Sequence, residues 1–224
     1  MKLGFDDERS ACDRGIRPAG RRMSAASQAR HEAILAAAKA AFLEGGYQLA
    51  SMDRIAERAQ TTKRTVYDHF GSKDALFSAV IAAACRNVVA ALPEPGSLPK
   101  DPREGLAQFA REVADVIGTV GCIRLQRLVI SESERHPHFA GMLYDTALMG
   151  AENVLADYLE RCVADDWLKP HDCRASARLL IDVMVHGASL RKLFAVAERE
   201  EEQDASNEKA DHMIDMLIAA YRPH

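Results

Sequence analysis

The stretch 51–77 constrains the fold more than any other part of the chain, because three helical patterns follow one another there with only short gaps. Ser51 precedes the first pattern and Ser72 precedes the third, and serine at such a position caps a helix. The shorter pattern between them places Val66 and Phe70 one turn apart on one face and ends at Gly71. The predicted apolar positions of the first and third helices are Ile55, Ala56, Ala59, Leu76, Phe77, Val80 and Ile81. Two short helices joined by a tight turn, the second polar on its outer face, form a helix-turn-helix.

The outer face of the second helix carries the residues that suggest a function. Either Thr61 or Thr62 can cap this helix. If Val66 and Phe70 point inward, the outward residues are Lys63, Arg64, Thr65, Tyr67 and Asp68. Cationic side chains at a helix N-terminus suit phosphates and guanine edges, and hydroxyls add further contacts. The alternative is an ordinary solvated helix in an all-helical protein.

The chain from Arg30 to about Val80 resembles the DNA-binding domain of the tetracycline-repressor (TetR) family of transcriptional regulators. The resemblance rests on the segments HEAILAAAKAAFLEGGY, SMDRIAERA and TTKRTVYDHFGSKDALF. Tyr67 and Phe70 match the family's aromatic-x-x-Phe step, and Lys73 matches a lysine that follows it. The resemblance implies that the DNA-binding residues are Thr61, Thr62, Lys63, Arg64, Thr65, Tyr67, His69 and Lys73.

Three positions depart from the family pattern. Gln60 stands in the turn where glycine is usual, so strain at that point must be absorbed in another way. Thr61 replaces a small apolar residue, and Arg64 replaces a glycine. These departures bear on which operator sequence is recognised, and not on DNA binding itself.

The distribution of charge agrees with a DNA-binding head on a larger body. The chain has 224 residues and a net charge of −4. Residues 1–74 contain 13 Lys and Arg against 10 Asp and Glu, a balance of +3, so the remaining 150 residues carry −7. A mildly basic front and an acidic back fit this division, although chance alone also produces a difference of this size.

The cysteines and hydropathy indicate the compartment. The five cysteines are scattered and form no C-x-x-C pair, which argues against zinc and against a disulfide framework. Cys85 and Cys122 fall in apolar patterns and are expected to be small buried hydrophobes. No apolar run is long enough to span a membrane, and the N-terminus lacks the apolar core of a signal peptide. We therefore expect a cytoplasmic protein without a cofactor.

The predicted fold is all-α, with an N-terminal three-helix helix-turn-helix head and a C-terminal helical bundle, about nine helices in all. Residues 1–27 are predicted to be a disordered arm, in which Arg17, Arg21 and Arg22 either reach DNA or merely aid solubility. The DNA-binding domain is expected over 28–75, and the ligand-binding and dimerisation domain over 76–224. Outside 51–71, the predicted helices are 28–44, 72–92, 101–117, 122–134, 137–164, 173–196 and 207–221.

Three features of this helix pattern lead to further expectations. Pro93 to Pro102 forms the clearest internal boundary, so the helix before it should bridge head and body. The acidic run 198–204 is expected to be a loop, or else to extend the last helix. Broad apolar faces on the last two helices predict a homodimer through a four-helix contact, as the resemblance also implies, with a self-contained monomer as the alternative. Two-fold symmetry in turn predicts a near-palindromic double-stranded operator.

The resemblance also implies a small-molecule pocket between the bridging helix and the helices that follow. Candidate lining residues are Phe109, Met142, Tyr144 and His186, each of which is also typical of an ordinary core. The segment RLVISESERHPHF resembles one C-terminal subgroup of TetR regulators. Because repression is the commoner mode in the family, the resemblance implies a repressor that a small hydrophobic effector releases from DNA, with an activator as the alternative.

Enzymatic functions find little support in the sequence. No G-x-S-x-G, P-loop, H-E-x-x-H or G-x-G-x-x-G motif occurs, so no catalytic residue is predicted. His136 and His138 have no third ligand at metal spacing and are interpreted as residues at a helix start. A helical adaptor that binds only protein, and an enzyme of unknown class, are the alternatives to a regulator.

Overall fold

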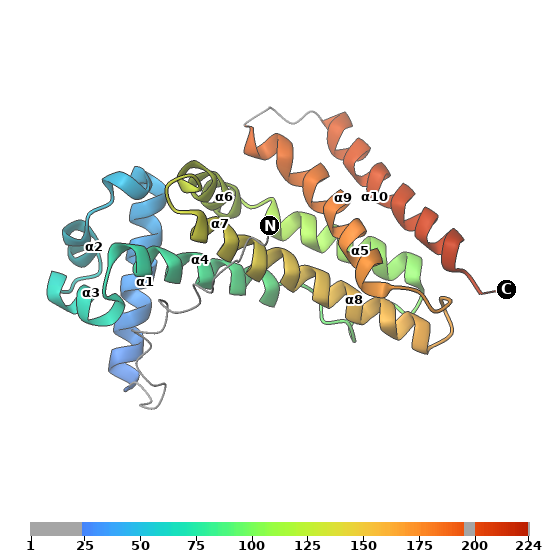
Figure 1. The fold of residues 1–224 in the computed structure, drawn as a ribbon, viewed down its shortest axis with the longest axis horizontal. Helices are drawn as coiled ribbons and strands as arrows, with labels where there is room; N and C mark the ends of the chain where they lie inside the picture. Colours follow the sequence, from blue (N-terminus) through green and yellow to red (C-terminus); the bar gives the residue numbers. More distant parts are fainter. Residues whose placement is uncertain (1–23, 195–199, 224) are drawn as a thin grey trace, which may run out of the picture.

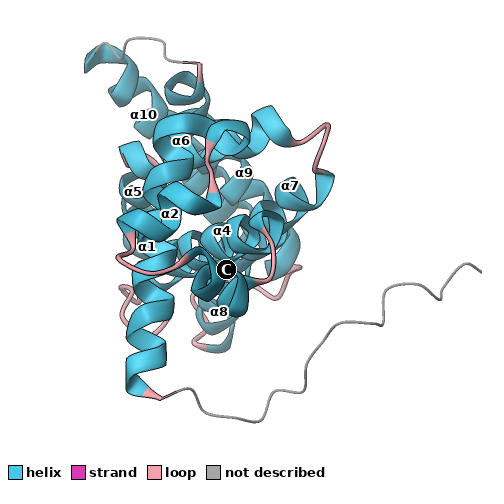
Figure 2. Cartoon of the chain, turned by 90° about the vertical axis from the view of Figure 1, so that its left-hand side faces the viewer, coloured by secondary structure: helices cyan, strands magenta, loops and turns pink. Residues whose placement is uncertain are grey.

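The chain folds into helices throughout the part that the computed structural model describes, residues 24–194 and 200–223 (Figures 1 and 2). No strand occurs within these two ranges, so the predicted all-α fold is confirmed. The helices near the N-terminus are α1 (Ala25–Leu49), α2 (Met52–Arg58), α3 (Lys63–Phe70) and α4 (Lys73–Ala90). The later elements are α5 (Pro102–Ile117), α6 (Val120–Glu132), α7 (Pro137–Leu143), the π-helical turn η1 (Tyr144–Leu148), α8 (Met149–Ala164), α9 (Cys173–Leu193) and α10 (Glu200–Tyr221).

The helices are arranged as a small head at one end of an elongated molecule. Figure 1 shows α1, α2 and α3 gathered at that end, α4 running from them into the middle, and α5, α8, α9 and α10 forming the far part. In the head, each helix begins at a hydroxyl side chain that accepts a backbone N–H three residues further on. These N-cap residues are Ser24, Ser51, Thr62 and Ser72. Each such cap stabilises its helix by about 1 kcal/mol, which explains why the starts of the short head helices were predictable.

One apolar core holds the head together, and we call it the head cluster. It joins α1–α4 to residues of α6 and α7, although these two helices follow the Pro-rich segment in the sequence. Its buried members are Ile34, Ala37, Ala38, Phe42, Tyr47, Ala50, Met52, Ile55, Ala56, Val66, Leu76, Phe77, Val80, Ile81, Cys85, Leu125, Val129 and Phe139.

A second apolar core, the body cluster, is built from α5, α8 and α9 together with loop residues and the end of α10. Its buried members are Leu92, Leu98, Leu106, Phe109, Val113, Ile117, Ala151, Leu155, Ala156, Tyr158, Leu159, Cys162, Leu168, Cys173, Ala177, Leu180, Ile181, Met184 and Ile214. The chain therefore has two cores, and α6 and α7 belong to the core of the head.

Helix boundaries differ from the sequence expectation at four places. α1 begins at Ala25 because Ser24 caps it, and it continues for one turn past Gly46, whose φ of 76° produces a kink. α6 begins two residues earlier than expected because Thr119 supplies the cap. The expected helix 137–164 is one run of helical backbone interrupted by the wider turn η1. α10 begins at Glu200, so the described part of the acidic run, residues 200–204, extends the last helix.

The arm residues Arg17, Arg21 and Arg22 lie outside the described part of the chain. Cys85 is buried as predicted, and burial raises the pKa of its thiol to about 11, while Cys122 is half-buried. Across residues 24–194 and 200–223, no helix is both long and apolar enough to cross a membrane.

Candidate nucleic-acid interface

Helix α3 is attached to the head by a narrow apolar edge. Val66 is completely buried in the head cluster, and Phe70 packs partly buried against the His31 ring, with ring centroids 4.5 Å apart. Gly71, with a φ of 76°, ends the helix and donates its N–H to the carbonyl of Tyr67. Lys63, Arg64, Tyr67 and Asp68 are left exposed, as the helix-turn-helix interpretation requires.

The turn before α3 contains a backbone conformation that L-residues rarely adopt. Gln60 has a φ of 51°, at the position where the family pattern usually has glycine. A left-handed conformation costs a residue with a Cβ about 1–2 kcal/mol. Two turn hydrogen bonds hold it in place, from the N–H of Gln60 to Glu57 O at 3.0 Å and from the N–H of Thr61 to Ala56 O at 2.9 Å. The strain expected from the sequence is therefore present and is held by the turn.

The two cations at the start of α3 differ in their freedom. The Arg64 side chain is 91% exposed, and its closest carboxylate is Asp68, 3.9 Å away. The Lys63 ammonium instead bonds Asp53 of α2 at 2.9 Å, and this hydrogen bond raises the pKa of Lys63. The Arg64 guanidinium can contact a phosphate or a base directly. The Lys63 ammonium must first separate from the Asp53 carboxylate, or contact both groups together.

The same stretch of the chain also carries three threonines and a tyrosine. Thr62 caps α3, and its Oγ1 lies 2.8 Å from that of Thr65, so the two threonines form one polar edge. Tyr67 is exposed on the same helix, and Thr61 is half-buried in the turn. Donors and acceptors of this kind contact phosphates and base edges in protein–DNA complexes.

His69 is half-buried at the far end of α3 and faces His31 of α1, with 5.8 Å between ring centroids. Burial, with a smaller contribution from His69, lowers the pKa of His31. His31 stacks on Phe70, so it helps to fix the end of α3 against α1. Sequence reasoning did not identify His31, because no local motif marks a histidine that packs across two helices.

Lys73 lies at the junction of α1 and α4. Its ammonium donates to the backbone carbonyl of Gln48 at 3.1 Å and lies 4.6 Å from the centre of the Tyr47 ring. Burial lowers the pKa of Lys73, while the charges of Asp74 and Glu132 act in the opposite direction. An ammonium has three N–H donors, so a donor remains for a phosphate. The structure thus holds Lys73 in one place.

The four residues considered for an effector pocket are not brought together. Phe109 is fully buried in the body cluster, whereas Met142 packs against the head cluster. Tyr144 is exposed in η1, and the side chain of His186 lies outside the described part of the structure. Of the three whose side chains the structure describes, none lines either of the two cavities found in the head and beside α4.

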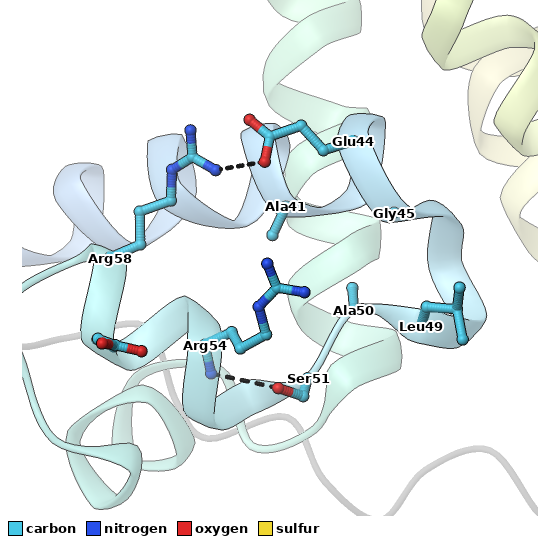
Figure 3. A pocket seen from close by; sticks show the side chains of 9 residues that line it. Ala41, Glu44, Gly45, Leu49, Ala50, Ser51, Arg54 and Arg58 are labelled. Carbon is cyan, nitrogen blue, oxygen red and sulfur yellow. Dashed lines mark hydrogen bonds and ion pairs between the residues drawn. The ribbon is translucent and has the colours of Figure 1, made fainter.

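The larger of these cavities, about 440 Å³, lies between the end of α1 and α2 (Figure 3). The Arg54 side chain extends into it, and the ion pair of Arg58 with Glu44, at 2.8 Å, forms part of its wall. A second cavity of about 280 Å³ lies beside α4, with walls from α1, the end of α5 and the start of α6. Within the described ranges, no group of three His, Cys, Asp or Glu side chains is placed to hold a metal ion.

Comparison with known proteins assigns the two halves of the chain separately. Residues 34–80 match the family model described as bacterial regulatory proteins of the tetR family. Residues 104–223 match the model described as the C-terminal domain of AefR-like transcriptional repressors. The second match alone covers more than half of the chain.

Solved structures agree with this assignment. A TetR-family regulator from Mesorhizobium loti superposes with a TM-score of 0.76 at 23% identity, covering 89% of this chain and all of that one. The flavonoid-responsive regulator FrrA superposes with a TM-score of 0.72 at 27% identity, covering 87% of this chain and 98% of that one.

One curated relative is the HTH-type transcriptional activator FasR of Mycolicibacterium smegmatis, 34% identical over 88 residues. The match spans 39% of this chain and only 40% of the length of FasR. The matched families consist of transcription regulators and not of enzymes. With a matching helix-turn-helix domain, a matching C-terminal domain and the same fold, the chain belongs to the TetR family of transcriptional regulators.

Proposed function

We propose that the protein is a ligand-responsive repressor that binds a near-palindromic DNA operator as a homodimer. The observation that supports this most strongly is the start of α3, where Arg64 is almost completely exposed and the same turn carries the paired hydroxyls of Thr62 and Thr65. A cationic, hydroxyl-bearing helix end of this kind fits the major groove, where arginine reads guanine.

The residues of α3 and its surroundings divide into two roles. Thr62, Lys63, Arg64 and Tyr67 enter or line the major groove, with Thr61 and Thr65 beside them at its edge. His69 and Lys73 contact phosphates. Lys63 exchanges Asp53 for DNA when the complex forms, which is feasible because both partners are more than half exposed. A DNA-binding role of this kind places the protein in the cytoplasm.

An apolar stripe on α9 supports the homodimer. Leu179 and Leu190 are exposed and lie 11 residues apart, which puts them on one helical face, and the exposed Phe194 follows as the C-cap residue. Met216 of the neighbouring α10 is exposed as well. A second copy of the chain would cover these side chains and would place two α3 helices about one DNA turn apart, roughly 34–36 Å, or a multiple of it.

Two similarities support repression that responds to a ligand. The C-terminal domain matches AefR-like repressors over 120 positions, 104–223, whereas the match to the activator FasR covers a smaller part of the chain. FrrA, which has the same fold, is named for its response to flavonoids, so a small hydrophobic effector suits this chain also. An effector that changes the position of α4 would change the spacing of the two heads. A coupling of about 1–3 kcal/mol alters DNA affinity about 5- to 150-fold.

The cavity beside α4 is the proposed point of entry for an effector. Its wall includes Asn87 and Val88 of α4, Val116 of α5 and Leu125 of α6, so an apolar molecule there would contact three helices at once. A panel of hydrophobic compounds should contain some that raise the melting temperature of the protein, because a ligand that binds only the folded state stabilises it. Asn87→Trp, which fills the cavity, should remove this response, whereas Asn153→Trp on the exposed surface of α8 should keep it.

A selection of random DNA with the purified full-length protein tests the function. We expect an enriched motif made of two inverted half-sites, and an affinity that falls steeply with salt. A reporter gene behind that motif should be expressed less when the protein is present, and an increase would indicate an activator. Enrichment of no motif, together with an affinity indifferent to salt, would contradict the proposal and favour an adaptor that binds only protein.

A further inference from the structure

The C-terminal end of α6 meets the head through a buried carboxylate. Glu132 is only 6% exposed, yet it lies in a segment that follows the Pro-rich boundary. Its Oε2 accepts a hydrogen bond of 2.8 Å from the side-chain amide of Gln48, at the end of α1. A carboxylate is rarely buried unless it is paired, so this contact anchors α6 to the head.

Gln48 continues this connection on its other side. Its backbone carbonyl is among the last four of α1, which have no partner within the helix. The ammonium of Lys73 supplies the missing donor at 3.1 Å, and a cation at a helix C-terminus is also favoured by the helix dipole. Glu132, Gln48 and Lys73 therefore form one chain of contacts from α6 to a proposed phosphate contact.

Neighbouring side chains brace the same junction. The hydroxyl of Tyr47 donates to Asp74, and the Tyr47 ring lies below the Lys73 ammonium. The His136 ring follows α6 and packs against Tyr47, with 5.0 Å between ring centroids. The Lys73 ammonium is thus bordered by Tyr47 and Gln48, which in turn contact the end of α6 and the residues that follow it.

The same helix is also tied to α9, which carries the proposed dimer contact. The Arg127 guanidinium of α6 donates to the carbonyl of Leu193 at 2.8 Å and to that of Lys192. Both carbonyls belong to the last turn of α9, so Arg127 contacts the C-terminal end of that helix. α6 therefore connects α9 to the head directly, alongside the route through α4.

We propose that Glu132 is a positioning residue for DNA binding, which acts through Gln48 to fix the Lys73 ammonium where it meets a phosphate. A shift of α6 relative to α1 then changes the affinity for DNA by releasing Lys73. The proposal rests on the proposed function, in which Lys73 contacts the DNA backbone.

The sign of the effect separates this role from simple electrostatics. Removing the negative charge of Glu132 makes the head more positive, which by itself strengthens binding to DNA. Removing a positioning residue instead weakens binding, because Lys73 becomes free to adopt other conformations. The two roles therefore predict opposite changes for the same variant.

The test measures affinity for the selected operator at several salt concentrations with the full-length protein. We expect Glu132→Ala to bind about 3- to 10-fold more weakly, within the range found when a connecting residue is changed, with a salt slope smaller by about 1. Gln48→Ala should behave alike, because it keeps the backbone carbonyl but loses the link to Glu132. Gln48 is exposed, so this variant should fold even if Glu132→Ala does not.

Two further variants complete the design. In a double-mutant cycle, Glu132→Ala should add nothing to the loss caused by Lys73→Ala, because both act through the same ammonium. Glu152→Ala is the matched control, since it removes another buried carboxylate, one that pairs with Arg178 inside the body, and it should leave the affinity and the salt slope unchanged.

Other outcomes identify which proposal fails. Unchanged or tighter binding by Glu132→Ala and Gln48→Ala, or additive losses in the cycle, would overturn the positioning role while DNA binding by the wild type stands. An unaltered affinity in Lys73→Ala would overturn it as well. Absence of an operator for the wild-type protein would overturn both the positioning role and the proposed function.

Discussion

The head cluster and the body cluster are both apolar, but they are built differently. In the head cluster, the Phe77 ring lies 4.7 Å from the ring centroid of Phe42, 5.1 Å from Tyr47 and 4.8 Å from Phe139. In the body cluster, the large fully buried side chains other than Phe109 are aliphatic. Because Phe139 belongs to α7, the aromatic core of the head is completed by a segment far along the chain. Helices α1–α4 therefore do not form a complete core by themselves, because α6 and α7 supply part of it.

The largest expected effect comes from breaking this aromatic core. Phe77→Ala should lower the free energy of unfolding by about 3–5 kcal/mol, because it removes a fully buried ring and leaves a cavity. Hydrogen exchange should accelerate in α6 and α7 as much as in α1 and α4, since all four helices share the cluster.

Phe109→Ala is the counterpart in the body cluster and should cost a similar free energy. Its accelerated exchange should concentrate in α5, α8 and α9. If both variants accelerated exchange equally over the whole chain, the two clusters would unfold as one cooperative unit and not as two.

A smaller effect is expected from the helix caps. Thr62→Ala removes the cap of α3 and Asp101→Ala removes the cap of α5, each at a cost of about 1 kcal/mol in chemical denaturation. The two variants should differ in operator affinity, because only Thr62 is one of the proposed DNA contacts. Equal losses of operator affinity in the two variants would contradict the assignment of α3.

The left-handed residues Gln60 and Asp166 offer a finer comparison, since one lies in the head and the other in the body. Gln60→Gly should raise the free energy of unfolding by about 0.5–1 kcal/mol, because glycine adopts this conformation without strain. Asp166→Gly should gain less, because aspartate tolerates positive φ better than glutamine does. No gain for Gln60→Gly in the same denaturation assay would show that the turn before α3 is not strained.

The smallest expected effect concerns pH. Burial lowers the pKa of His31, so the unfolded chain binds a proton there more readily than the folded chain does. The contribution of neutral His31 to the free energy of unfolding is therefore complete above the pKa of the unfolded chain, about 6.5. It is lost as the pH falls below that value. His31→Gln should show a smaller drop in melting temperature between about pH 7.5 and about pH 5.5. An equal drop in the variant and the wild type would show that His31 does not contribute to the pH dependence of stability.

The difference between local and long-range packing in the head explains which features the sequence could predict. The head helices are marked by local signals, such as the hydroxyl caps Ser51, Thr62 and Ser72, and their positions were predicted to within a few residues. The membership of α6 in the head cluster carries no local signal, because Leu125 and Val129 look like any apolar pair on a helix.

At the candidate site, residue types were predictable and their partners were not. The exposure of Arg64 follows from helical spacing once Val66 is placed inside. The pairing of Lys63 with Asp53, and of Lys73 with the Gln48 carbonyl, depends on how separate helices pack. Side chains 10 and 25 residues apart can meet in many ways, so only the packed structure selects one.

The selection of random DNA, repeated with Arg64→Ala, tests the central claim most directly. If α3 presents this arginine to the bases, the variant should lose its preference at one position in each half-site while the remaining motif persists. Lys73→Ala should keep the complete motif but bind it more weakly. A motif unchanged by Arg64→Ala would show that the exposed end of α3 does not read the sequence.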